Sequence, residues 1–339
     1  MSRAKIAPVS WHPARATERA RQKESRVPLP ELRLVDVGGE GPEDVLVGGD
    51  GSVWTGTADG AVRRISFADD GSPRVEVVAK TGGRPLGLEW LPDGRLLVCD
   101  AERGLLAVDP RDGAVVVLTA EVAQKPLTLC NNAAVAGDGR VWFTDSSDHH
   151  GLTDWRAEIF EHSGTGRLLC REASGDGVAL VAAHLEFANG VALAPDGSAV
   201  FFAETGSYRI SKVWLTGPSA GIQEVVLDNL PGFPDNISTG TDGLIWIGMA
   251  GARERLVDAL APAPPWVRKL AWATPEFLQP QAKPIAWVMA FDPADGRVVH
   301  DLQASRPGFG MSTGVREWNG TVWLGSLTGT TIASFRLPR

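Results

Sequence analysis

The sequence predicts an all-β fold, a six-bladed β-propeller with a short helical lid inserted between blades five and six. Six tight turns recur roughly 45 residues apart, with a longer gap before the last, and a period of this size is typical of propellers and solenoids. The turns are Asp50-Gly51, Asp93-Gly94, Asp138-Gly139, Asp196-Gly197, Asp242-Gly243 and Asn319-Gly320. Short apolar runs flank each turn, as in a β-hairpin. A tryptophan also stands four residues after the start of four turns, at Trp54, Trp142, Trp246 and Trp323, where packed blades need large side chains.

The order of segments predicts one folded domain of residues 31–339 behind a polar N-terminal leader of residues 1–30. Glu31 to Val37 alternates apolar and polar residues, as a half-buried strand does. The last repeat lacks a fourth strand after Leu337, and we expect the 31–37 strand to supply it. This closure would remove sheet edges that otherwise invite aggregation.

Residues 250–285 separate the fifth and sixth turns. They hold the segments ARERLVDAL and WVRKLAWATPEFL around a proline break at Pro262, Pro264 and Pro265, which predicts two short amphipathic helices. The insertion is either a lid over a binding pocket or a decoration without function.

Composition limits the classes of partner. The formal net charge of -8 argues against binding to a phosphate backbone, so we expect no nucleic-acid partner and a small-molecule substrate instead. Three cysteines without a CxxC spacing indicate a reducing compartment and no structural zinc. No apolar stretch is long enough for a signal peptide or a span, which predicts a cytoplasmic protein without a membrane partner.

One position in the repeat carries oxygen-bearing side chains. The residue seven before the turn start is Glu43, Asn131, Asn189 or Asp235 in four repeats, and Leu86 or Ser312 in the other two. We expect these positions to form one ring at the propeller axis. Carboxylate and amide oxygens without histidine or cysteine suit a hard cation, so the ring predicts a Ca²⁺ site, although another divalent cation would also fit.

Further residues are candidates for the pocket near the ring. Asp145 and Glu204 stand where the second strand returns to the ring, and would orient its ligands or line the pocket. His149, beside His150, is either a proton shuttle at the pocket mouth or part of a solvated loop. Asn132, Ser312 and Thr313 complete the candidate pocket residues.

Four motifs resemble one protein superfamily. GPEDV at 41–45, NNAAVAGDGRVWFTDSS at 131–147, FANGVALAPDG at 187–197 and LPGFPDNI at 230–237 are similar to the strictosidine synthase-like branch of the senescence marker protein/gluconolactonase/luciferin-regenerating enzyme superfamily. The segment PPWVRKLAW at 264–272 resembles that of adipocyte plasma membrane-associated protein-like members. The resemblance implies a six-bladed propeller. In the calcium-dependent hydrolases of this superfamily the matching positions hold the metal, which implies that Glu43, Asn131, Asn189 and Asp235 are ligands here and that Asp235 takes part in catalysis.

The resemblance also has two departures. Thr313 stands where plant strictosidine synthase has its catalytic glutamate, which argues against a condensation reaction of that type. Asn132 stands where the hydrolase-like motif has an aspartate. The interpretation that fits best is a calcium-dependent hydrolase of a lactone or related ester, of the gluconolactonase, lactonase or arylesterase type. The alternatives are a ligand-binding propeller without turnover and a strictosidine synthase-like enzyme that joins C–C or C–N bonds.

Overall fold

Six four-stranded antiparallel sheets are arranged as the blades of a propeller, which confirms the predicted fold. The computed structural model describes residues 4–338, apart from residues 23, 176, 276–284 and 307. From the second blade round to the first, the first strands of successive blades lie side by side around the axis. Part of the predicted lid, residues 276–284, lies outside the described residues.

Each blade is built from four strands, and each strand pairs with the next one in its sheet. Blade one has β2 (Leu46–Val47), β3 (Val53–Gly56), β4 (Ala61–Phe67) and β5 (Pro73–Lys80). Blade two has β6 (Pro85–Trp90), β7 (Leu96–Asp100), β8 (Gly104–Val108) and β9 (Val115–Thr119). Blade three has β12 (Cys130–Val135), β13 (Val141–Asp145), β14 (Gly166–Arg171) and β15 (Val178–Leu185).

The other three blades follow the same plan. Blade four has β16 (Ala188–Leu193), β17 (Ala199–Glu204), β18 (Arg209–Trp214) and β19 (Gln223–Leu227). Blade five has β20 (Gly232–Thr239), β21 (Ile245–Ala252), β22 (Ala286–Phe291) and β23 (Val298–Ala304). Blade six has β24 (Ser312–Trp318), β25 (Thr321–Ser326), β26 (Thr331–Arg336) and β1 (Arg33–Asp36). A small hairpin of β10 (Glu121–Val122) and β11 (Lys125–Pro126) joins blades two and three.

The N-terminal strand closes the propeller, as the sequence predicts. β1 pairs with β26 in antiparallel register, with Val35 opposite Ile332. Both side chains are buried in a cluster that also holds Trp323 of blade six and Val53 of blade one. The closing strand thus contributes to the core between the last blade and the first.

The tryptophans of the repeat occupy the predicted core positions. Trp54, Trp142, Trp246 and Trp323 lie on the second strands of blades one, three, five and six, and all four are buried. Each packs in the layer between neighbouring blades, where large apolar side chains fill the space that widens away from the axis.

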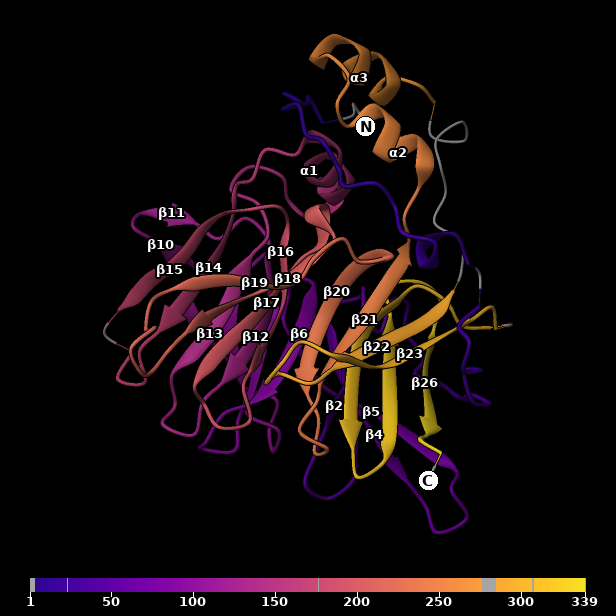
Figure 1. Cartoon of the computed structure of the whole chain (residues 1–339). Helices are drawn as coiled ribbons and strands as arrows, with labels where there is room; N and C mark the ends of the chain where they lie inside the picture. The colour runs from indigo at the N-terminus through magenta and orange to yellow at the C-terminus, as the bar shows by residue number, and fades with distance from the viewer. Residues whose placement is uncertain (1–3, 23, 176, 276–284, 307, 339) are drawn as a thin grey trace.

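Three helices of the described part of the chain lie on one face of the propeller (Figure 1). α2 (Arg255–Leu260) and α3 (Pro265–Trp272) confirm that the insertion is helical, but it joins β21 to β22. It therefore lies within blade five, and its predicted position between blades five and six is wrong, because the strand after it completes the fifth blade. A 3₁₀ turn, η2 (Leu152–Asp154), and α1 (Trp155–Glu161) join β13 to β14 on the same face and were not expected. Another 3₁₀ turn, η3 (Thr205–Ser207), follows β17.

The N-terminal segment packs along this helical face (Figure 1). The backbone N–H of Trp11 donates to the carbonyl of Ala261 (3.1 Å), and the Trp11 ring stacks on His162 with 4.3 Å between ring centroids. Further along, Arg19 in the short 3₁₀ turn η1 (Arg19–Arg21) forms an ion pair with Asp301 of blade five. The polar leader is thus fixed to both helical insertions and to a blade.

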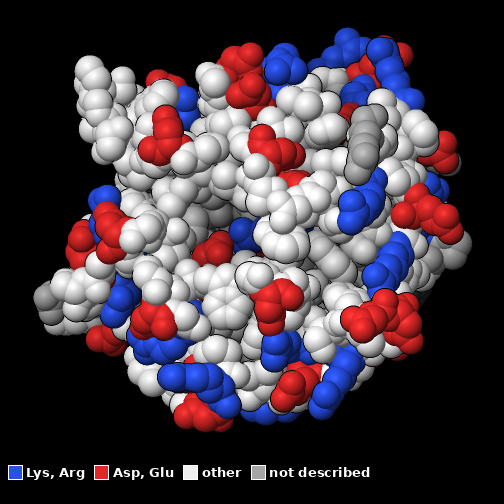
Figure 2. Space-filling model, turned by 90° about the horizontal axis from the view of Figure 1, so that it is seen from below, with Lys and Arg blue, Asp and Glu red and all other residues white. Residues whose placement is uncertain are grey.

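No described helix has the length and apolar character needed to cross a bilayer. On the face opposite the helices, acidic and basic side chains are intermixed around a central hollow (Figure 2).

Candidate functional site

One residue in the first strand of each blade, or just before it in blade one, lines a single cavity on the helical face. The cavity has a volume of about 880 Å³. The six residues are Glu43, Leu86, Asn131, Asn189, Asp235 and Thr313. The structure therefore brings together all four oxygen-bearing residues that were predicted as metal ligands.

The sixth ring position is Thr313, whereas the count from the turn predicts Ser312. In blade six Trp323 pairs with Arg316, seven residues before it, while the corresponding tryptophans of blades three and five pair with residues eight before them. The cause is the turn, because only two residues separate the paired ends of β24 and β25. Ser312 is buried away from the cavity, where its hydroxyl accepts a hydrogen bond from the backbone N–H of Trp287 (3.0 Å).

Two hydroxyl groups set the orientation of the ring asparagines. Ser146 donates its proton to the carbonyl of Ala188 (2.6 Å), so its oxygen is free to accept from Nδ2 of Asn131 (2.9 Å). In the next blade Thr205 donates to the carbonyl of Pro234 (2.7 Å) and accepts from Nδ2 of Asn189 (3.1 Å). A hydroxyl has one proton, so each must meet the NH₂ side of its amide. The Oδ1 atom of each asparagine is therefore on the side of the amide opposite the hydroxyl.

Three oxygens of the ring have no hydrogen-bond partner among the described residues. Oδ1 of Asn131, Oδ1 of Asn189 and Oε2 of Glu43 are all buried and unpaired within the described residues. Oε1 of Glu43 accepts from Nδ2 of Asn236 (2.9 Å), whose own Oδ1 is also unpaired. Unpaired buried oxygens cost free energy, and this hard-oxygen set matches the donors that Ca²⁺ prefers.

The electrostatics of the ring agree with a cation site. Burial raises the pKa of Asp235 to about 7, although hydrogen bonding from Asn189 opposes the shift. Burial also raises the pKa of Glu43 well above its usual value, and the nearby carboxylates of Asp235 and Asp44 raise it further. Two negative charges at this place are therefore unfavourable on their own, and a divalent cation between them would restore both to the ionised form.

Three of the predicted pocket residues connect elements of the fold and do not line the cavity. Oδ1 of Asn132 accepts from the backbone N–H of Val191 (2.9 Å) and so joins blade three to blade four. Asp145 is fully buried, where it accepts from the backbone N–H of Leu129 (2.7 Å) and forms an ion pair with Arg167 (2.8 Å).

Glu204 makes the same kind of connection in blade four. It forms an ion pair with Arg209 (2.7 Å) and accepts from the hydroxyl of Ser211 (2.7 Å). The residues that orient the ring ligands are Ser146 and Thr205, each one position after the predicted Asp145 and Glu204. Alternation along the strand explains the difference, because neighbouring side chains point to opposite faces.

His149 also lies outside the cavity lining. Its ring is partly exposed beside His150, and its Nδ1 lies 2.7 Å from Oδ1 of Asp148. The pair lies close to the side chain of Glu161, the last residue of α1.

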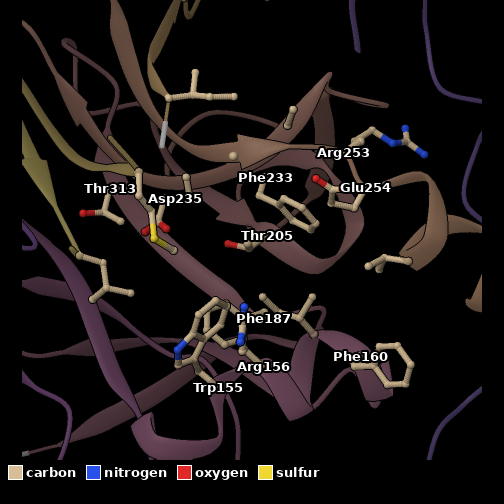
Figure 3. A pocket seen from close by; sticks show the side chains of 18 of the residues that line it. Trp155, Arg156, Phe160, Phe187, Thr205, Phe233, Asp235, Arg253, Glu254 and Thr313 are labelled. Atoms are coloured by element: carbon tan, nitrogen blue, oxygen red, sulfur yellow. The ribbon is translucent and has the colours of Figure 1, made fainter. Parts of the chain in front are cut away.

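Apolar side chains form most of the walls above the ring, and the charged side chains of Arg156, Arg253 and Glu254 lie among them (Figure 3). Asp235 and Thr313 lie at one end of the cavity, Phe187 and Phe233 lie on facing sides, and Phe160 lies toward the other end. α1 supplies the wall that sequence reasoning missed, although its Trp155–Ile159–Phe160 pattern carries the spacing of an amphipathic helix. The N-terminal segment contributes its own lining residues, namely Ala16, Ala20, Arg21 and Gln22.

Comparison with known families gives two matches. A sequence model described as SMP-30/gluconolactonase/LRE-like region matches residues 61–263, and one described as strictosidine synthase-like, N-terminal, matches residues 29–65.

Similar proteins of known sequence come from animals and plants. The chain is 36% identical to the adipocyte plasma membrane-associated protein of Salmo salar over 252 residues, which are 68% of this chain and 59% of that protein. It is 33% identical to the protein strictosidine synthase-like 6 of Arabidopsis thaliana over 288 residues, which are 83% of this chain and 76% of that protein. The match thus spans less than two thirds of the length of the salmon relative.

Solved structures show the same fold at low sequence identity. A gluconolactonase from Xanthomonas campestris superimposes with a TM-score of 0.64 at 18% identity, covering 100% of this chain and 99% of that one. The calcium-binding protein regucalcin from Agrobacterium tumefaciens gives a TM-score of 0.60 at 16% identity, covering 89% and 91%.

Proposed function

Because the chain belongs to the SMP-30/gluconolactonase/LRE-like family, we propose that it is a calcium-dependent hydrolase of a lactone or related ester. The observation that carries the proposal is the set of buried, unpaired oxygens of Glu43, Asn131 and Asn189 beside the carboxylate of Asp235 in one cavity. A scaffold without a ligand has no use for such atoms, since each costs free energy in the fold. Some structural neighbours are gluconolactonases or calcium-binding by name, which agrees with this chemistry.

Glu43, Asn131, Asn189 and Asp235 would hold the cation. Two carboxylates balance the charge of a divalent ion, and the two amides add neutral oxygen ligands whose orientation Ser146 and Thr205 already fix. When bound, Ca²⁺ polarises a substrate carbonyl and stabilises the negative charge that develops on its oxygen.

Asp235 is the group that would act on protons in this cavity. Its carboxylate lies at the ring end of the cavity, where a bound cation would keep it ionised and therefore able to accept a proton. In the hydrolytic step, a water oxygen adds to the carbonyl carbon and its proton passes to Asp235. The C–O bond of the ester then breaks, and the same proton passes to the departing alkoxide. Direct attack by the carboxylate of Asp235 on the carbonyl carbon is the alternative first step.

The walls of the cavity favour a substrate with an apolar body. Phe187, Phe233 and Trp155 surround the space between the ring and the mouth, and the volume of about 880 Å³ lies toward the upper end of the range for drug-sized ligands. A small polyhydroxylated lactone would leave its hydroxyl groups against these apolar surfaces. Aliphatic lactones and aryl esters therefore fit the cavity better than sugar lactones.

The test combines metal analysis with a panel of substrates. The purified protein is stripped with a chelator, reloaded with Ca²⁺ and assayed on aliphatic lactones, aryl esters and a sugar lactone. We expect hydrolysis that disappears with chelator, returns with Ca²⁺ and is greatest on apolar substrates. Hydrolysis that is indifferent to chelator would contradict the proposed site, and hydrolysis at the native rate in Asp235→Asn would leave Asp235 as a ligand only. Calcium and ligand binding without any turnover would favour the non-catalytic propeller.

A further inference from the structure

A second group of metal-ligating side chains lies outside the ring, where the loop after β13 meets the end of α1. The ligand atoms of His149, His150 and Glu161 lie within 4.8 Å of one another. Nε2 of His150 is 2.6 Å from Oε2 of Glu161, and Nε2 of His149 is 3.5 Å from Oε1 of the same carboxylate. One carboxylate thus faces both imidazoles through its two oxygens.

The local backbone brings the two neighbouring histidines to the same side. In an extended strand adjacent side chains point in opposite directions. Here Oγ of Ser147 accepts from the backbone N–H groups of both His149 (3.2 Å) and His150 (2.9 Å), and the tight turn that results places the ring centroids 4.3 Å apart. The same hydroxyl donates to Oε2 of Glu158 (2.6 Å), so the turn is itself anchored to α1.

The carboxylates come from one face of α1. Glu158 and Glu161 are three residues apart, a spacing that places helical side chains side by side. Both are buried, with residue exposures of 1% and 4%, whereas the side chain of His149 is 40% exposed. Oε2 of Glu158 lies 3.9 Å from Nε2 of His149, behind the first three groups. The carboxylates of this group are therefore buried, while His149 is open to solvent.

We propose that His149, His150 and Glu161 bind a divalent cation of the Zn²⁺ type, at a site separate from the ring. Two imidazole nitrogens and one carboxylate oxygen suit a borderline ion, while Ca²⁺ prefers oxygen ligands alone. Ligand atoms about 2.0–2.1 Å from a tetrahedral zinc are about 3.3 Å from each other. The 3.5 Å separation already fits, and the 2.6 Å contact would open as the metal replaces the proton that His150 and Glu161 share.

The electrostatic field at the site favours a cation. Carboxylate oxygens of Asp148, Glu161 and Glu158 lie 2.7, 3.5 and 3.9 Å from the ring nitrogens of His149. Glu158, which Ser163 and Thr165 also hold by hydrogen bonds, stays beside the site as a fixed negative charge.

Occupancy of this site would fix a wall of the substrate cavity. α1 carries Glu158 and Glu161 on the side of the metal site and Trp155, Ile159 and Phe160 on the side of the cavity. The proposed ion would join the loop after β13 to the last turn of this helix. We therefore expect it to stabilise α1 without touching substrate.

The test uses Co²⁺ as a spectroscopic probe on the full chain. Protein stripped of metal is reloaded with Ca²⁺ to fill the ring and is then titrated with Co²⁺. We expect one additional Co²⁺ per chain, with the visible absorption of a tetrahedral site, displacement by Zn²⁺ and a rise in Tm. His149→Gln should weaken Co²⁺ binding at least tenfold, while His300→Gln, on blade five, is the matched control and should change nothing.

Further variants distinguish loss of the proposed site from misfolding and from effects on the calcium ring. His150→Gln and Glu161→Gln should abolish binding but replace buried groups, so His149→Gln, at a partly exposed position, is the deciding variant. Asp235→Asn should weaken Ca²⁺ binding and leave Co²⁺ binding intact, whatever its effect on hydrolysis. Absence of Co²⁺ binding at millimolar concentration, or equal affinity in His149→Gln and the native chain, would overturn the proposal and leave a proton-sharing histidine–glutamate pair only.

Discussion

Replacing Thr205 by valine should disorient a ring ligand without removing it. The hydroxyl of Thr205 donates to the carbonyl of Pro234 (2.7 Å) and accepts from Nδ2 of Asn189 (3.1 Å). Valine keeps the branched shape but offers neither bond. The NH₂ group of Asn189 then keeps only its hydrogen bond to Asp235, so the amide is held less firmly and can turn a donor toward the cation.

The expected magnitude follows from the bonds that are lost. Two buried hydrogen bonds, at about 1 kcal/mol each, correspond to about 2 kcal/mol of folding stability. Loss of an outer hydrogen-bond partner of a metal ligand weakens metal affinity by about 10- to 100-fold. Because Pro234 precedes Asp235, release of its carbonyl also loosens the backbone of a second ligand, so we expect the effect on affinity to lie toward the upper end.

Isothermal titration with Ca²⁺ and thermal unfolding of the metal-free protein measure the two effects separately. Thr205→Ser is the matched control, since it keeps the hydroxyl and should retain near-native affinity. Ser146→Ala should reproduce the loss at Asn131, where the same arrangement holds. If Thr205→Val binds Ca²⁺ within twofold of the native chain while folded, the hydroxyl does not orient the ligand and the reasoning is wrong.

Four further outcomes are expected. Asp235→Asn should keep the fold and lower kcat by roughly 10²-fold at saturating Ca²⁺, as steady-state kinetics would show, whereas near-native kcat would leave it a ligand only. Asn131→Ala should weaken Ca²⁺ affinity at least tenfold, with activity partly restored by excess Ca²⁺; no rescue would indicate another role. Burial raises the pKa of Asp235 to about 7 in the metal-free fold, against about 3.9 in an unfolded chain, so this group destabilises the metal-free protein as pH rises between those values. Stabilisation by Ca²⁺, measured as the rise in Tm, should therefore be larger at about pH 8 than at about pH 5, and an opposite trend would contradict the assignment. Trp11→Ala should free the N-terminal segment from His162 and raise KM with little change in kcat, unless that segment plays no part in the cavity.

The repeat made the blades and four ligands predictable. Asp-Gly turns and buried tryptophans report the local strand register, and the ligands lie a fixed distance from those turns. Asn319-Gly320 broke the rule because its turn is shorter, which moved the ring position from Ser312 to Thr313. Counting back from the turn therefore finds the ring residue only in blades whose turns have the same length.

The covering elements could not be predicted from the repeat. α1 occurs in one blade only, so no other blade reports its presence, and its 7 residues make only about two turns. The N-terminal segment is polar by composition, yet it is held by backbone contacts such as Val9 N–H to the carbonyl of Glu161 (2.8 Å). Contacts of this kind leave no side-chain pattern in the sequence.

The ring and the contacts between neighbouring blades depend on the same pairs of adjacent residues. The first strand of each blade exposes an unpaired backbone edge toward the axis, and buried backbone groups require partners. Asp44, beside the ring residue Glu43, accepts from the N–H of Leu88 in blade two (2.9 Å), and Asn132 does the same for blade four. Alternation sends one residue of each pair into the cavity and the next to the neighbouring blade. A substitution at Asp44 or Asn132 should therefore weaken Ca²⁺ binding by separating two blades, although neither residue lines the cavity.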